Sequence, residues 1–147
     1  MKKQKHPTIT ESELDVLVSI AIRRAEFLDD ERSSAAPDSW FEVMLYEEKI
    51  AEVTSPSDIP GGIARVGAVR AALAAGQRVK ALSLASQYLD EDLLPSERKT
   101  AIKQTLQEDQ EITARRFPSL AKTGRLAELD EWIVAALKST RVFPLAA

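Results

Sequence analysis

Glycine and proline are scarce in this chain, and nearly all of them fall between segments whose apolar residues recur at the spacing of a helix. Its 147 residues include five Gly and seven Pro. Because both residue types interrupt helices, their placement marks helix ends. The chain is also rich in Ala, the best helix former. The sequence predicts an all-α fold, with about six helices packed as antiparallel αα-hairpins in a single domain.

The apolar periodicity and the capping signals place the helix boundaries. Helices are expected at residues 11–29, 37/39–53, 63–75, 77–89, 96–116 and 125–138. Thr10 with Glu13 forms a capping box before the first helix, and Ser39 with Glu42 forms a second candidate box. Residues 54–62 are the longest stretch rich in helix breakers, and they predict a flexible loop.

Two stretches hint at an internal repeat. Residues 73–82 and 121–129 both have the pattern helix, glycine turn, amphipathic helix, with Gly76 and Gly124 at the turns. A separation of roughly 48 residues lies near the upper end of helical-repeat periods. A helical-repeat arrangement is therefore an open alternative to a simple bundle.

The ends of the chain are expected to be tails. Residues 1–9 form a basic tail, residues 10–140 the domain and residues 141–147 a C-terminal tail. No run of about 20 apolar residues suits a membrane span, and no apolar segment follows the basic start as in a secretory signal. We expect a cytoplasmic protein.

Composition excludes several kinds of chemistry. The absence of Cys rules out disulfides and thiolate catalysis, and a lone His6 cannot form a catalytic triad or a multi-histidine metal site. We therefore expect no metal, no cofactor and no enzymatic activity.

The charge balance bears on nucleic-acid binding. A net charge of −3 argues against it, because phosphate neutralisation needs a basic face. A nucleic-acid-associated regulator using Arg65, Arg70, Arg78 and Lys80 is a minor alternative.

Charged residues interrupt the apolar stripes of three expected helices. Glu47 projects from the stripe of the second helix, Arg70 from that of the third, and Asp109 and Arg116 share the narrow stripe of the fifth. An unpaired charge in an apolar interior is costly, so Arg70 is predicted to bridge Glu47 and Asp109, with Arg116 as an alternative partner. Two interpretations stay open: a buried ion-pair network, or a pocket for a small polar or anionic ligand or for acid–base chemistry.

Two expected helices are apolar on two sides. The extra strips consist of Val16, Ile20 and Phe27 in the first helix, and of Ala81, Leu84 and Tyr88 in the fourth. Such a helix is central in its bundle or covered by another chain. The strip on the first helix is thus a candidate homodimer interface.

Acidic clusters and aromatic residues suggest a protein partner with a basic surface. The candidate binding residues are Glu47, Glu48, Asp90, Glu91, Asp92, Trp132 and Phe143. The predicted function is a non-enzymatic bacterial interaction module, such as an adaptor or a toxin-neutralising immunity or antitoxin-type protein.

Overall fold

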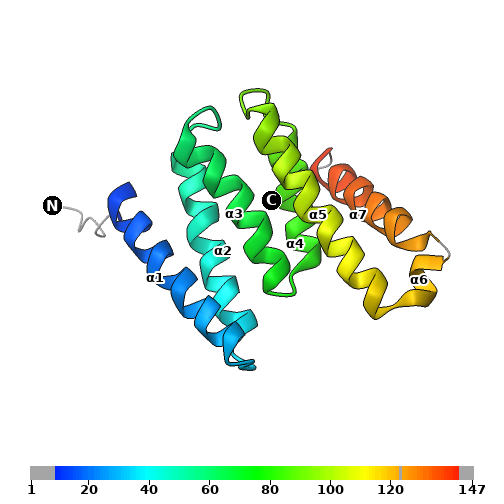
Figure 1. Cartoon of the computed structure of the whole chain (residues 1–147). Coiled ribbons are helices and arrows are strands. Elements are labelled where there is room, and N and C mark those ends of the chain that lie inside the picture. The colour runs from blue at the N-terminus through cyan, green and yellow to red at the C-terminus, as the bar shows by residue number, and fades with distance from the viewer. Residues whose placement is uncertain (1–8, 123, 143–147) are drawn as a thin grey trace, which may run out of the picture.

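The described part of the chain is built of helices and connecting turns (Figure 1). The computed structural model describes residues 9–122 and 124–142, without the side chains of residues 120, 121 and 139–142. The helices are α1 (Glu11–Asp30), α2 (Ala36–Val53), α3 (Ile59–Ala74), α4 (Arg78–Leu89), α5 (Ser96–Arg116), α6 (Pro118–Lys122) and α7 (Arg125–Val142). The all-α prediction is confirmed, with the short α6 added to the six expected helices. Most of the expected tails, with His6 and Phe143, lies outside the described residues.

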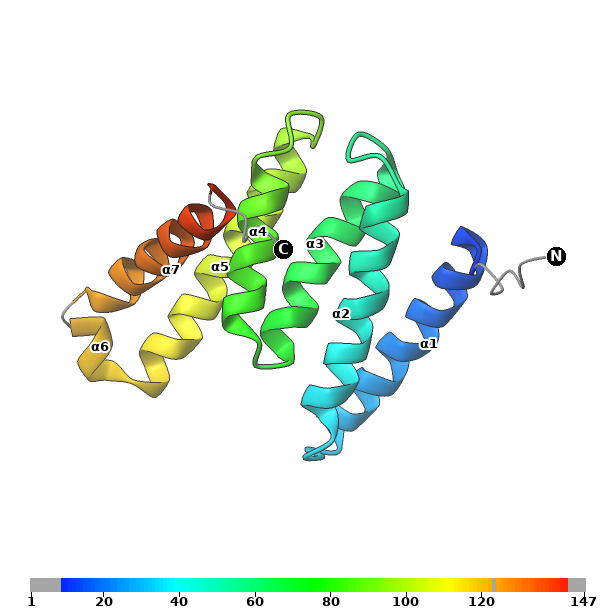
Figure 2. The ribbon, with the colours of Figure 1, turned by 180° about the vertical axis from the view of Figure 1, so that it is seen from behind.

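The helices form an open row in which neighbours along the chain pack together (Figure 1). α2 lies between α1 and α3, α3 contacts α4 and α5, and α7 packs on α4 and α5. Seen from behind, α4 lies in front of α5, so the row becomes two helices deep after α3 (Figure 2). α1 and α3 both pack on α2 but do not contact each other.

The first two helix starts test the predicted capping boxes. The Thr10 hydroxyl accepts a hydrogen bond from the backbone N–H of Glu13 at 3.2 Å, as predicted. The second box is wrong. α2 begins at Ala36 with Pro37 in its first turn, so Ser39 lies inside the helix, where it is buried and its hydroxyl has no hydrogen-bond partner among the described residues.

The two helices with a second apolar strip have different surroundings. α4 contacts α3, α5 and α7, and its strip of Ala81, Leu84 and Tyr88 is buried. Among the described helices α1 contacts α2 alone, and its strip of Val16, Ile20 and Phe27 is 60%, 50% and 61% exposed. The central-helix interpretation is confirmed for α4 and wrong for α1.

The loop predicted at residues 54–62 is shorter, because α3 already begins at Ile59. Gly61 and Gly62 are buried in the first turn of α3. A Cβ on Gly61 would lie 1.9 Å from the carbonyl oxygen of Ser55. The sequence predicts both glycines to lie in the loop, whereas Gly61 lies in α3 and allows the backbone before the helix to approach it closely.

The turn after α3 ends as predicted. Gly76 has a φ of +74°, and the N–H of Gln77 donates to the Ala72 carbonyl at 2.8 Å, which closes the helix end. Gly124 also has a positive φ, of +65°. Both glycine turns therefore share a left-handed conformation, and the repeat hypothesis stays a prediction.

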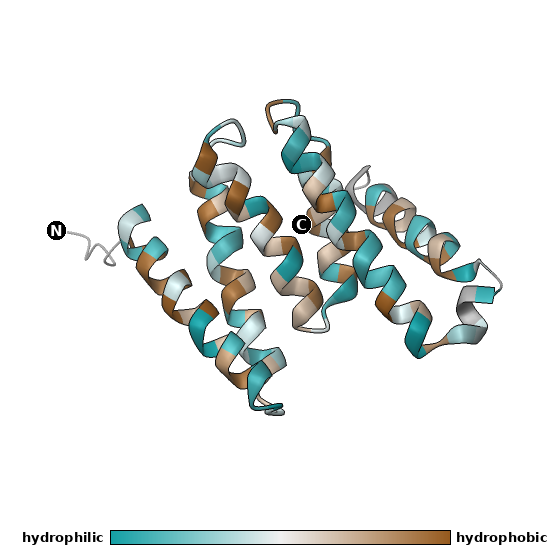
Figure 3. Ribbon diagram, in the orientation of Figure 1, coloured by the Kyte–Doolittle hydropathy of each residue, from teal (hydrophilic) through white to brown (hydrophobic). Residues whose placement is uncertain are grey.

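Polar residues dominate α5, which lies between these two turns along the chain (Figure 3). Its buried residues are Ile102 and Thr105.

Candidate functional site

A groove runs between α1 and α3, with α2 as its floor. It exists because both helices pack on α2 without touching each other. The cavity in this groove has a volume of about 420 Å³. Its lining consists of Ile22 and Glu26 of α1; Trp40, Val43 and Glu47 of α2; Ile63, Val66, Gly67, Arg70, Ala71 and Ala74 of α3; and Arg98 of α5. We call it the α1–α3 groove.

Glu47 projects from α2 into this groove. It is 7% exposed, and a Cβ on Gly67 would lie 2.8 Å from its carboxyl carbon, so the carboxyl group packs directly on the bare backbone of α3. Among the described residues, none forms an ion pair or a hydrogen bond with this carboxyl group. Burial, together with the negative charge of Asp15, raises the pKa of Glu47 to about 7.

The predicted bridge from Arg70 to Glu47 and Asp109 is wrong. No ion pair within 4.0 Å joins Arg70 to either carboxylate in the part of the chain that the structure describes. The guanidinium instead donates from Nε to the Thr105 hydroxyl at 3.4 Å. The reason is the rotation of α3: its most buried residues include Ala64, Ala68 and Ala72, and Arg70 is exposed.

A second cavity, of about 540 Å³, lies between α3 and α5 and continues from the groove past Arg70. Arg70 and Ala74 line both cavities, whereas Asp109 and Arg116 line the second alone. The structure therefore brings Arg70 near Glu47 on one side and near Asp109 and Arg116 on the other. Glu47 and Asp109 share no cavity.

The partner of Asp109 is Arg78, at the start of α4. Arg78 pairs with Asp109 through Nη1 and with Asp130 through Nη2, the latter at 2.6 Å. Gln110 donates a further hydrogen bond to Asp130 at 2.6 Å. These contacts tie α4, α5 and α7 together. Asp130 is a buried charge that the sequence prediction did not include, although it follows Leu126 by four residues and thus interrupts the apolar stripe of its own helix.

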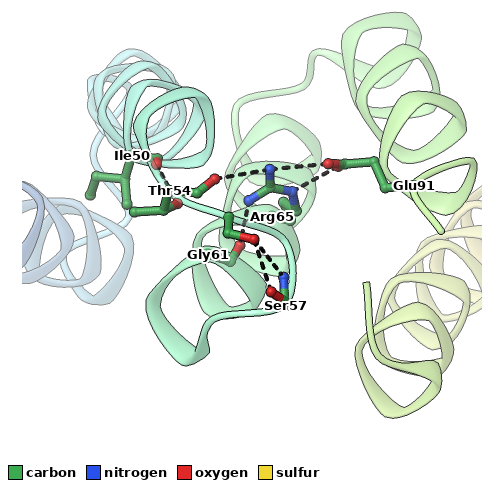
Figure 4. Close-up of polar contacts among 7 residues, drawn as sticks. Ile50, Thr54, Ser57, Gly61, Arg65 and Glu91 are labelled. Atoms are coloured by element: carbon green, nitrogen blue, oxygen red, sulfur yellow. Dashed lines mark hydrogen bonds and ion pairs between the residues drawn. The ribbon is translucent and has the colours of Figure 1, made fainter. Parts of the chain in front are cut away.

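Arg65 is a second buried charge, whose burial the sequence did not predict (Figure 4). It is 5% exposed, and its Nε and Nη2 donate to the two carboxylate oxygens of Glu91 at 2.7 and 3.1 Å. It also donates to the carbonyl oxygens of Gly61 at 3.0 Å and Thr54 at 3.3 Å. Its guanidinium lies 5.6 Å from the ring centre of Tyr88, a residue whose pKa is raised chiefly by burial. Arg65 thus joins the end of α2, the start of α3 and the segment after α4.

The other candidate partner-binding residues lie apart from the groove lining. Glu48 pairs with Lys80 at 2.9 Å and lines a small cavity with Glu91, whereas Asp90 and Asp92 are exposed. Trp132, on α7, is 69% exposed, and Phe143 lies outside the described residues. That these residues bind a partner stays a prediction, as does a homodimer through Val16, Ile20 and Phe27.

The nucleic-acid alternative loses much of its basic face. Arg65, Arg78 and Lys80 each pair with a carboxylate, whereas Arg70 forms no ion pair in the described part of the chain.

In the described residues no group of three or more His, Cys, Asp or Glu side chains could hold a metal ion. None of the described helices combines the length and apolar content that crossing a bilayer requires.

Comparison with protein-family models, with curated proteins and with solved structures finds no match to this chain.

Proposed function

We propose that this protein is a protein-binding module that takes an amphipathic helix of its partner into the α1–α3 groove. The observation that carries the proposal is the groove itself: an apolar cavity between two helices that share a floor and leave each other uncovered. A helix laid into such a groove buries its apolar face, which is a common mode of peptide recognition. An adaptor or a toxin-neutralising protein would both use such a surface.

Exposed apolar side chains in the groove support this function. Ile63, on the α3 wall, is 51% exposed, and the α1 wall contributes Ile22. Glu26, Arg70 and Arg98 add charge to this apolar lining. Apolar contacts combined with charged groups suit a helix with one apolar and one polar face.

Two variants would close the groove without disturbing the core. Ala74 is exposed and lines both cavities, so Ala74→Trp fills the junction between them. Ile63→Asp places a charge in the apolar wall. Val79→Asp is the matched control, because Val79 is 54% exposed near the start of α4 and lines neither cavity.

The test is quantitative capture from a lysate of the source organism with the wild type and all three variants as baits. We expect a stoichiometric partner that the wild type and Val79→Asp retain and that Ala74→Trp and Ile63→Asp lose at least tenfold. Circular dichroism would verify that each bait is folded. Equal retention by all four baits, or no retained partner, would overturn the proposal.

A small-ligand site is the second candidate function. It is favoured by Glu47, a buried carboxyl group in a cavity whose volume falls in the range of small-molecule sites. A thermal-shift screen of small polar molecules against the wild type and Glu47→Gln would test it. A stabilising hit that disappears in the variant would support a ligand site over a helix site.

A further inference from the structure

We propose that Glu47 selects the partner by pairing with a primary ammonium group, the end of a lysine side chain that enters the α1–α3 groove. This inference rests on the proposed function, because it names the chemistry of the residue that the partner helix must present. It starts from a residue that is 7% exposed and lines a cavity, and whose carboxyl group forms no ion pair among the described residues.

The charged groups around Glu47 leave it available. From α1, Asp15 acts on it electrostatically and Glu26 lines the same cavity. From α3, Arg70 is directed to Thr105, and from α5, Arg98 lays its aliphatic stem over Gly62, where a Cβ would lie 3.1 Å from it. Neither arginine forms an ion pair with Glu47 among the described residues, so the carboxyl group stays open to a cation from the partner.

The shape and chemistry of the groove favour ammonium over guanidinium. The stem of a lysine is aliphatic and packs along apolar lining while its end remains polar. Glu47 contributes two carboxylate oxygens to that lining, which match the compact ammonium group. A guanidinium carries five N–H donors, most of which a single carboxylate in an apolar cavity would leave without acceptors.

Removing this pairing group need not damage the fold, which makes the inference testable. Glu47→Gln keeps the shape and removes the charge. Glu48→Gln is the matched control, because Glu48 is the next residue on α2 and pairs with Lys80 outside the groove. The probe is n-pentylammonium, with n-pentanol as the uncharged analogue of equal length.

The experiment is a titration of the full chain followed by the backbone amide signals of Glu47 and Gly67. We expect the wild type and Glu48→Gln to bind n-pentylammonium at least tenfold more tightly than Glu47→Gln does, while n-pentanol binds all three alike. Because the carboxylate form must be present, affinity for the amine should rise about tenfold from pH 6 to pH 8 in the wild type and in Glu48→Gln, but not in Glu47→Gln. Equal amine binding by the wild type and Glu47→Gln, or wild-type binding no tighter than that of n-pentanol, would overturn the inference.

The outcomes separate this inference from the proposed function. If Ala74→Trp abolishes partner capture while amine affinity does not depend on Glu47, the groove binds a partner but Glu47 does not select a lysine. If amine affinity depends on Glu47 while Ala74→Trp captures the partner as well as the wild type does, the groove is a site for amines and the helix-binding function is wrong.

Discussion

Arg65 and Glu47 are buried to nearly the same extent, at 5% and 7% exposure, yet their surroundings are opposite. Arg65 donates hydrogen bonds to Glu91 and to two backbone carbonyls (Figure 4). Its guanidinium also lies over the ring of Tyr88. Glu47 packs on a glycine and faces a cavity with no partner in the described chain. The two residues are therefore buried to the same extent, but only Arg65 has hydrogen-bond and ion-pair partners.

The presence or absence of partners decides how each buried charge affects stability. A buried charge with all its partners present holds segments together, and removing it leaves those partners unpaired. A buried carboxyl group without a partner destabilises the protein whenever it is ionised. The proposed pairing with an ammonium group in the groove would offset this cost.

The largest effect should come from breaking the satisfied site. Arg65→Ala removes the counter-charge of the half-buried Glu91 and two links to backbone carbonyls, so we expect a loss of about 3 kcal/mol or more in the free energy of unfolding. Arg65→Lys should recover less than half of this, because an ammonium cannot reproduce the planar fork. Urea denaturation measures both. Arg23→Ala, which removes an exposed arginine of α1, is the control and should change stability by less than about 0.5 kcal/mol.

A loss within about 1 kcal/mol for Arg65→Ala would contradict the comparison, since the two buried charges would then be equally dispensable.

The second effect depends on pH and concerns the unsatisfied site. With a pKa of about 7 in the folded protein against an ordinary value of 4.5, Glu47 binds a proton more tightly when folded. The wild type should therefore lose stability as the pH rises from 4.5 to 7, and the loss should be complete above that window. Relative to Glu47→Gln, the loss amounts to as much as about 3 kcal/mol at pH 8.

Unfolding by urea at pH 4.5, 6 and 8 would measure this difference, because other titrating groups cancel between the two proteins. A wild-type-minus-variant difference that stays constant across the three pH values would mean that Glu47 is not held in an unfavourable ionised state.

The smallest effect comes from the glycine beneath Glu47. Gly67→Ala places a methyl group 2.8 Å from the Glu47 carboxyl carbon, so the carboxyl group must move and the helix gains less than alanine usually provides. In a Glu47→Ala background the same change should stabilise α3 by up to about 1 kcal/mol. A double-mutant cycle measures the coupling between the two residues. Additive effects would show that Gly67 and Glu47 act independently.

The fold could be predicted from the sequence because periodicity and breakers depend on neighbours along the chain. The stripe with Leu14, Val18 and Ala21 and the left-handed turn at Gly76 are local features of this kind. The start of α3 could not be predicted in this way. Gly61 has its role because Ser55 packs against it, and from the sequence alone a glycine there also indicates a loop.

The candidate site was half predictable for a similar reason. A charge inside an apolar stripe is visible in one helix, and this test correctly found Glu47 as a buried charge. Which residues lie beside Glu47 depends on how α3 is rotated against α2 and α5. The Ala-rich α3 buries small residues on a face that its branched residues do not mark. Arg65 was therefore missed and Arg70 was placed in the interior.

The single-sided packing of α1 has a consequence for the order in which the protein opens. α1 is joined to α2 through a turn in which Arg32 has a φ of +53°, and it lacks a second helical neighbour among the described residues. Its amide protons should exchange with solvent at a lower opening free energy than those of α4, which is enclosed by three helices. A partner in the groove would touch α1 from its open side and raise that opening free energy by linkage. Hydrogen exchange along α1 would then report occupancy of the groove without any label on the partner.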